Sequence, residues 1–200
     1  MGRSRTPFGG VTLADPSKWY VTLDEPPASF EQGDIFRNAT IPMISAVDLW
    51  ATSEIPIRRG SLIILTQTCD IPKVPALLLA EVYSYESLVS KSSPAAARNA
   101  FRSTKTIESL IRNQAENFFL LPPVPGSSSD IPAWSVVSFR HLHVVSHGVL
   151  EYRANEETPV RMASPYKEYL GESFARFMMR VALPEPLDDF KAVGWSKLDI

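Results

Sequence analysis

Two short apolar runs separated by a proline-containing loop constrain the fold of this chain most strongly. Residues 61–65 (SLIIL) and 76–83 (ALLLAEVY) have the length and apolar content of buried strands. Between them, residues 70–75 (DIPKVP) contain Pro72 and Pro75, which have no N–H group to donate to a neighbouring strand. The pattern predicts a strand, a loop and a returning strand.

The rest of the chain alternates strand signals with helical ones. Strands are expected over 19–23, from 34–36 after a turn at 32–33, over 118–121 and over 134–145, with a hairpin through Gly148 into 149–152. Residues 41–57 indicate a loop or a bent strand, and 122–130 a loop. Helical segments are expected between about 87 and 115. The clearest helix follows Ser164-Pro165 and ends at Pro184, and its apolar spacing requires the sheet to cover one face.

Composition is that of an ordinary globular protein. The chain has 200 residues, of which 44% are hydrophobic and 21% charged, so one well-buried core is expected. We expect an extended N-terminal arm at 1–30, a single domain at 31–183 and a C-terminal tail at 184–200. The formal net charge of -2 provides no global positive field for nucleic acid, although a local basic groove would still bind it.

A single cysteine, Cys69, leaves no internal disulfide to form, and no secretion signal is visible, so a cytoplasmic protein is expected. The longest apolar runs are around four to six residues, far below the roughly 18 that span a bilayer, so no membrane partner is expected. No paired cysteines supply the ligands of a zinc site, and we expect neither a metal nor a cofactor.

The order of these pieces suggests a family. The matching stretches are Gly33-Asp34-Ile35, residues 59–66, residues 77–80, residues 135–140 with Val144 and Val145, and the final helix at 165–183. Together they resemble the MazF/PemK/CcdB-like toxin fold. The resemblance implies an α+β protein with a small SH3-like (MazF/PemK-like) β-barrel, an inserted helical segment and a closing amphipathic helix. Residues 66–71 (TQTCDI) are similar to a run in an uncharacterised bacterial branch of this barrel type, for which the resemblance implies no activity.

The resemblance also implies candidate catalytic residues. In that family the barrel binds single-stranded RNA and cleaves it without a metal, using an arginine just before the second strand and a hydroxyl at the end of the third. Arg58 or Arg59 fills the first position, and Ser84 suits the second. From their chemistry alone, Asp70, Glu81 and His141 are candidates for proton transfer.

Further polar residues are candidates for binding. Residues Thr66, Gln67, Thr68 and Cys69 follow a buried strand directly, where Thr68 and Asp70 suit the capping of backbone groups. In the run Arg140-His141-Leu142-His143, strand alternation puts His141 and His143 on one face, which suits an exposed sheet surface, pH sensing or phosphate contact. Cys69 would be a nucleophile if either histidine lay beside it, and otherwise a small buried side chain.

These observations favour a non-catalytic interaction subunit of a bacterial stress or phage-defence system of the toxin–antitoxin kind. The residues before the second strand, 55–60 (IPIRRG), replace the glycine-rich approach of the family, and aromatic, proline-rich arms at both ends suit a protein partner. The alternatives are a metal-independent endoribonuclease toxin and a cysteine-dependent hydrolase or transferase. RNA is a further candidate partner, and related barrels imply a homodimer.

Overall fold

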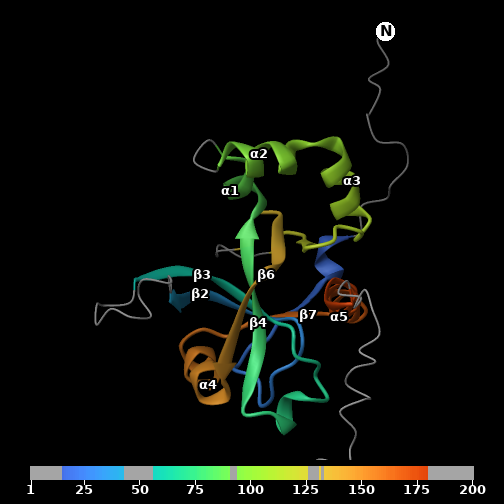
Figure 1. Ribbon diagram of the computed structural model, residues 1–200. Helices are drawn as coiled ribbons and strands as arrows, with labels where there is room; N and C mark the ends of the chain where they lie inside the picture. The colour runs from blue at the N-terminus through green and yellow to red at the C-terminus, as the bar shows by residue number, and fades with distance from the viewer. Residues whose placement is uncertain (1–14, 43–55, 91–93, 126–130, 132, 180–200) are drawn as a thin grey trace, which may run out of the picture.

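The computed structural model describes residues 15–42, 56–90, 94–125, 131 and 133–179. In this part of the chain seven strands form one sheet, in the order β1-β7-β2-β3-β4-β6-β5, and neighbouring strands are antiparallel (Figure 1). The strands are β1 (Tyr20–Val21), β2 (Asp34–Pro42), β3 (Ile57–Ile64), β4 (Ala76–Ser84), β5 (Phe118–Leu121), β6 (Ser135–Ser146) and β7 (Val160–Met162). The protein is therefore of the mixed α/β class, with the strand, loop and returning strand of the sequence prediction at its centre.

In the described ranges five α-helices pack around this sheet: α1 (Tyr85–Val89), α2 (Ala95–Arg102), α3 (Thr104–Ile111), α4 (His147–Glu156) and α5 (Tyr166–Met178). Two short 3-10 turns, η1 (Pro16–Lys18) and η2 (Ile71–Lys73), precede β1 and β4. Figure 1 shows α1, α2 and α3 at one end of β4 and α4 beside the other end of β6. The inserted helical segment and the closing helix thus lie where the sequence predicted them.

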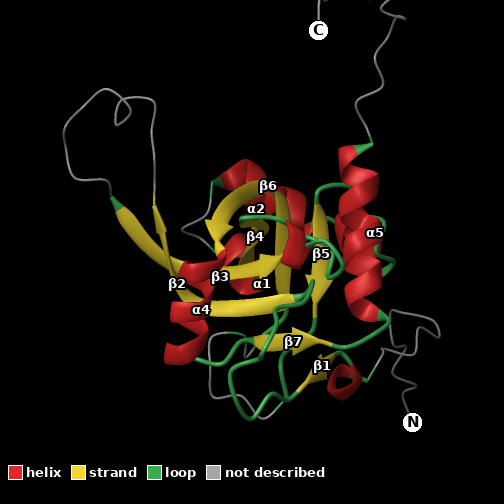
Figure 2. Cartoon of the chain, turned by 90° about the horizontal axis from the view of Figure 1, so that it is seen from below, coloured by secondary structure: helices red, strands yellow, loops and turns green. Residues whose placement is uncertain are grey.

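The sheet does not close into the barrel that we expected. β1 and β5 are the two ends of the strand order, and no strand pairing joins them in the described residues. Side chains connect the two edges instead: the Tyr20 hydroxyl donates to the Pro122 carbonyl at 2.7 Å, and the Trp19 ring lies 6.2 Å from that of Phe119. Tyr166 of α5 stacks on Trp19 at 4.1 Å, so the helix lies across this junction (Figure 2).

Alternation along β3 and β4 builds a core on each face of the sheet. Ile63 and Ala80 belong to the core that α5 covers, where Phe139 of β6 contacts two α5 rings. Leu62 and Leu79 belong to the opposite core, which α4 covers. A smaller cluster holds α1, α2 and α3 against the ends of β4, β5 and β6.

The predicted hairpin through Gly148 is wrong, because residues 147–156 form α4. Leu150 and Ala154, four residues apart, share one helix face and are buried in the core opposite α5. Burial of this pair outweighs the turn signal of a single glycine, which lies in the first turn with nothing within 4 Å of its Cβ position. Expectations about the N-terminal arm up to residue 14, the middle of the 41–57 segment and the tail after 179 lie outside the described residues.

A charge cluster around the buried Asp34 joins β2 and β7 to α5. Arg161 of β7 forms two hydrogen bonds to the fully buried Asp34, through Nε at 2.7 Å and Nη2 at 2.8 Å. Arg161 also contacts Glu31, and Lys167 of α5 contacts the other oxygen of that carboxylate. Burial raises the pKa of Asp34 although Arg161 opposes this, whereas the hydrogen bond from Lys167 is the largest influence that lowers the pKa of Glu31.

Candidate functional site

The carboxylate of Glu81, in the middle of β4, is the centre of a polar cluster on the sheet. Its side chain is only 5% exposed, yet it contacts side chains from both neighbouring strands and from its own strand. Arg58 Nη2 from β3 and the Tyr83 hydroxyl from β4 both donate to Oε2, and Nε2 of His143 from β6 lies 2.7 Å from Oε1. Arg58 and His143 are 32% and 22% exposed, so the cluster reaches solvent through these two residues.

The register of β3 places Arg58 over Glu81. Leu62 lies opposite Glu81, and Gly60 and Arg58 follow it on the same face towards the start of the strand. A Cβ atom at Gly60 would lie only 2.9 Å from Arg58 Nη1, so the absent side chain leaves the space in which the guanidinium lies. The sequence Arg-x-Gly on a strand is therefore the local reason for the geometry.

An irregularity in β6 brings His141 to the same cluster, beside the regularly paired His143. Leu142 pairs with Ala80 and Ser138 pairs with Glu81, so residues 139–141 of β6 have no register partner on β4. Such bulges turn side chains and are common beside active sites. His141 Nδ1 lies 3.0 Å from Ser138 Oγ.

Tyr83 connects these groups. The ring of Tyr83 lies edge-on to that of His141, with centroids 5.6 Å apart. Arg58 Cζ lies 5.8 Å from the centre of the Tyr83 ring. As strand alternation predicted, His141 and His143 both contact residues on the Glu81 face.

In this cluster a charged acceptor, the Glu81 carboxylate, is surrounded by hydrogen-bond donors. Burial of Glu81 raises its pKa, but hydrogen bonds from Tyr83, His143 and Arg58 and the charge of Arg58 together outweigh burial and leave the pKa below its ordinary value. Burial and the neighbouring Glu81 carboxylate raise the pKa of Tyr83 well above its ordinary value. At neutral pH, Glu81 is therefore ionised and Tyr83 is a neutral donor.

The structure separates the residues that the sequence put forward for catalysis. Arg58, Glu81 and His141 come together with His143. Three other candidates lie outside the cluster and have local partners: Arg59 Nη1 donates to the Asn38 carbonyl at 3.2 Å, Ser84 caps α1 by accepting from Ser87 N–H at 3.3 Å, and Asp70 pairs with Lys73 at 3.0 Å. Arg140 is exposed in the irregular part of β6.

The polar run after β3 has a structural explanation. Thr66 Oγ1 accepts from the Leu78 N–H at 2.8 Å, and Thr68 Oγ1 accepts from the Gln32 N–H at 3.1 Å, so the two hydroxyls tie the loop to β4 and to the start of β2. The Gln67 carbonyl accepts from the N–H groups of Asp70 and Ile71. Cys69 is exposed, and its Sγ lies 3.9 Å from Gln67 Oε1.

Sequence reasoning missed Tyr83 and Gly60. The available signal was alternation: Glu81 and Tyr83 are two residues apart on a predicted strand and so share a face, and Arg58 and Gly60 share a face in the same way. The pairing of β3 with β4, which places the two pairs together, is a tertiary contact that the sequence pattern does not specify.

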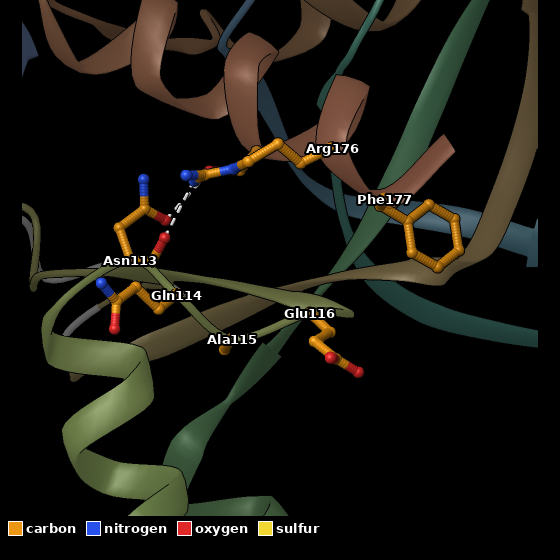
Figure 3. Close-up of a pocket in the computed structure, with 7 residues that line it drawn as sticks. Asn113, Gln114, Ala115, Glu116, Arg176 and Phe177 are labelled. Carbon is orange, nitrogen blue, oxygen red and sulfur yellow. Dashed lines mark hydrogen bonds between the residues drawn. The ribbon is translucent and has the colours of Figure 1, made fainter. Parts of the chain in front are cut away.

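A small pocket elsewhere on the molecule lies where α5 packs against the segment before β5. Its volume is about 160 Å³, and it is lined by Asn113, Gln114, Ala115, Glu116, Ser173, Arg176 and Phe177. Arg176 Nη2 donates to the Asn113 carbonyl at 2.9 Å and to Ser173 Oγ at 3.1 Å, and Figure 3 shows Arg176 and Asn113 directed towards one another. Because these groups satisfy one another and none belongs to the Glu81 cluster, we take the cluster as the candidate site.

Within the described ranges, no group of three or more histidine, cysteine, aspartate or glutamate side chains is arranged to hold a metal ion. No described helix is both long and apolar enough to cross a bilayer. Comparison with protein-family models, with curated proteins and with solved structures found no match to this chain.

Proposed function

We propose that this protein is an endoribonuclease that cleaves single-stranded RNA without a metal ion. The observation that carries the proposal is the convergence of Arg58, Glu81, His143 and His141 on one sheet face, with an ionised carboxylate, a cation and two imidazoles within one cluster. The order of strands and helices that resembles the MazF/PemK-like barrel supports the same activity, with the barrel left open between β1 and β5.

RNA cleavage of this kind needs a base, an acid and a cation. In the proposed reaction the Glu81 carboxylate takes the proton from a 2′-hydroxyl, whose oxygen forms a bond to the adjacent phosphorus. The bond from phosphorus to the 5′-oxygen breaks, and that oxygen takes a proton from the His141 imidazolium. The products are a 2′,3′-cyclic phosphate and a 5′-hydroxyl end, so atoms and protons balance.

The two histidines receive different roles because their contacts differ. His143 is bonded to Glu81 at 2.7 Å and thus orients the base. His141 is exposed and its Nδ1 lies 3.0 Å from Ser138 Oγ, so we assign its Nε2 to the leaving oxygen. Arg58 supplies the positive charge for the negatively charged phosphorus centre of the transition state.

The other functions expected from the sequence have less support. The interaction subunit was argued from the altered approach at residues 55–60 and from the terminal arms, most of which lie outside the described residues, and it stays a prediction. For the thiol enzyme, Cys69 needs a histidine, but His141 contacts Ser138, His143 contacts Glu81 and His147 contacts the Val74 carbonyl.

Incubating the full chain with total RNA in EDTA tests the proposal. We expect discrete fragments from the wild type, and a loss of cleavage of about 100-fold or more in Arg58→Ala. The matched control is Arg59→Ala, which removes the same side chain one residue away and should cleave normally because Arg59 contacts the Asn38 carbonyl instead. Intact RNA at high protein concentration would overturn the proposal and favour the interaction subunit.

A further inference from the structure

Arg58 and Glu81 neutralise one another in this structure, although the proposed reaction needs each of them for a different part of the substrate. The guanidinium reaches Glu81 through Nη2, while Nη1 lies in the space above Gly60. About a third of the Arg58 side chain is exposed, whereas the Glu81 side chain is almost fully buried. An anion arriving from solvent therefore meets Arg58 before it meets Glu81.

We infer that a phosphate group entering the site takes Arg58 away from Glu81 and occupies its place on the guanidinium. A guanidinium suits this exchange because its planar fork binds phosphate and carboxylate oxygens in the same way. The exposed His141 and the partly exposed His143 lie on the same face and supply further donors to an anion held by Arg58.

The exchange does not leave a buried charge without partners. The groups that face Glu81 are Arg58 from β3, Tyr83 from its own strand and His143 from β6. When Arg58 leaves, the Tyr83 hydroxyl still donates to Oε2 and His143 still contacts Oε1. A buried carboxylate that keeps two hydrogen bonds avoids most of the cost of an unpaired one.

Departure of Arg58 then changes the basicity of Glu81. Burial raises the pKa of Glu81, and the guanidinium contributes both a hydrogen bond and a charge to the opposing effect. Without them the pKa rises, so the carboxylate binds a proton more tightly at the moment when a 2′-hydroxyl must give one up. In this way, which rests on the proposed function, the substrate phosphate itself activates the base.

Binding of inorganic phosphate tests the exchange without any RNA. If Glu81 competes with phosphate for Arg58, then Glu81→Gln binds inorganic phosphate more tightly than the wild type, by about ten-fold or more, in isothermal titration calorimetry. The matched control is Glu172→Gln, which removes an exposed negative charge on α5 and should leave the affinity unchanged. Equal or weaker binding by Glu81→Gln, or no binding by either protein, would overturn the inference.

A second measurement uses the wild-type protein and does not depend on the folding of a variant. The pKa of Glu81, followed by carboxyl carbon NMR, should rise when inorganic phosphate replaces chloride at constant ionic strength. An unchanged pKa at saturating phosphate would overturn the inference. RNA that stays intact in the cleavage assay refutes the proposed activity alone, so the two failures are distinguishable.

Discussion

At the residue scale, Tyr83 is the side chain that links Glu81 to Arg58 and to His141. Its hydroxyl donates to Glu81, Arg58 Nη2 lies 3.5 Å from that hydroxyl, and its ring lies against His141. It therefore has a positioning role that the proposed reaction does not assign to it directly.

Replacing Tyr83 by phenylalanine keeps the ring and removes one donor from Glu81. Because that hydrogen bond lowers the pKa of Glu81, its loss raises the pKa, and the base must be ionised to act. The acidic limb of the pH–rate profile should therefore move to higher pH, with a loss of only about 1 kcal/mol in the free energy of unfolding. If the acidic limb of Tyr83→Phe does not move while its free energy of unfolding falls, Tyr83 has a structural role only.

Replacing Gly60 by alanine should displace the guanidinium of Arg58. The new Cβ would lie 2.9 Å from Arg58 Nη1 and 2.8 Å from Ile41 Cδ1, so one or both must move. We expect cleavage to fall at least ten-fold and the free energy of unfolding to fall by about 1–3 kcal/mol. The control is Gly148→Ala in α4, because no atom lies within 4 Å of the new Cβ position and a helix favours alanine. Unchanged RNA cleavage by Gly60→Ala would contradict the placement of Arg58.

The sequence predicted part of the candidate site and missed the rest for identifiable reasons. Arg58, His141 and His143 were predicted because residue type and strand alternation are local properties. The choice of Arg58 over Arg59 depends on the register of β3 with β4, which decides which of the two arginines shares a face with Glu81, and the sequence left both open. Ser84 has the hydroxyl that the resemblance asked for, but the start of α1 uses it as a cap.

At the element scale, the irregular part of β6 links the candidate site to α5. Residues 139–141 have no partners on β4, so Phe139 points into the core while His141 reaches the Glu81 face. Phe139 is fully buried, and its ring lies 5.4 Å and 5.8 Å from those of Phe174 and Phe177. One strand segment thus holds the helix on one side and a proposed catalytic acid on the other.

Truncating Phe139 to alanine should lower the free energy of unfolding by about 3–5 kcal/mol, because it leaves a cavity between β6 and α5. Urea denaturation measures this change. Val144→Ala on the same strand is the control, since Val144 is 73% exposed and should cost less than about 0.5 kcal/mol. Equal effects of the two changes would contradict the packing of α5 on β6.

Helix α4 shows why one element was predicted wrongly. Residues 147–156 contain a glycine near a strand end, which is also how a hairpin turn begins, and the apolar residues are few. The decisive contacts, those of Leu150 and Ala154 with the core opposite α5, come from β2, β3 and β4 and are invisible to a local pattern. Longer segments such as α5 were predicted correctly because the helical spacing of their apolar residues is visible in the local sequence.

At the scale of the whole molecule, closure of the sheet was the main feature that the sequence could not supply. Short apolar runs predict that the strands exist, but closure depends on whether the two edge strands pair with one another, which is a tertiary contact. β1 has two residues and β5 has four, and side chains from Tyr20 and Trp19 bridge the edges instead. The expected barrel is thus replaced by an open sheet with α5 across its junction.

Acid should destabilise the fold through its paired carboxylates. The pKa of Glu31 is lowered, first by the hydrogen bond from Lys167, and that of Glu81 is lowered despite burial. A lowered pKa in the folded state gives stability that is present above the unfolded value of 4.5 and is lost as pH falls through the folded pKa.

The free energy of unfolding should therefore decrease as pH drops below about 4.5, and Glu31→Gln should show a shallower decrease than the wild type. Chemical denaturation over this pH range measures both slopes. The raised pKa of Asp34 acts in the opposite sense; burial, its largest cause, is the same in both proteins, and only the smaller contribution of the Glu31 charge is lost in the variant. Identical slopes would contradict the role of the Glu31 pair.

The most direct test of the central claim, that the Glu81 cluster is a catalytic site, is the cleavage rate on a DNA oligonucleotide with a single ribonucleotide, measured in EDTA. The wild type should cut only after the ribonucleotide and leave a 2′,3′-cyclic phosphate, and folded Glu81→Gln should be slower by about 100-fold or more. If folded Glu81→Gln cuts at the wild-type rate, or if the all-DNA strand is cut equally well, Glu81 does not act as the base on a 2′-hydroxyl.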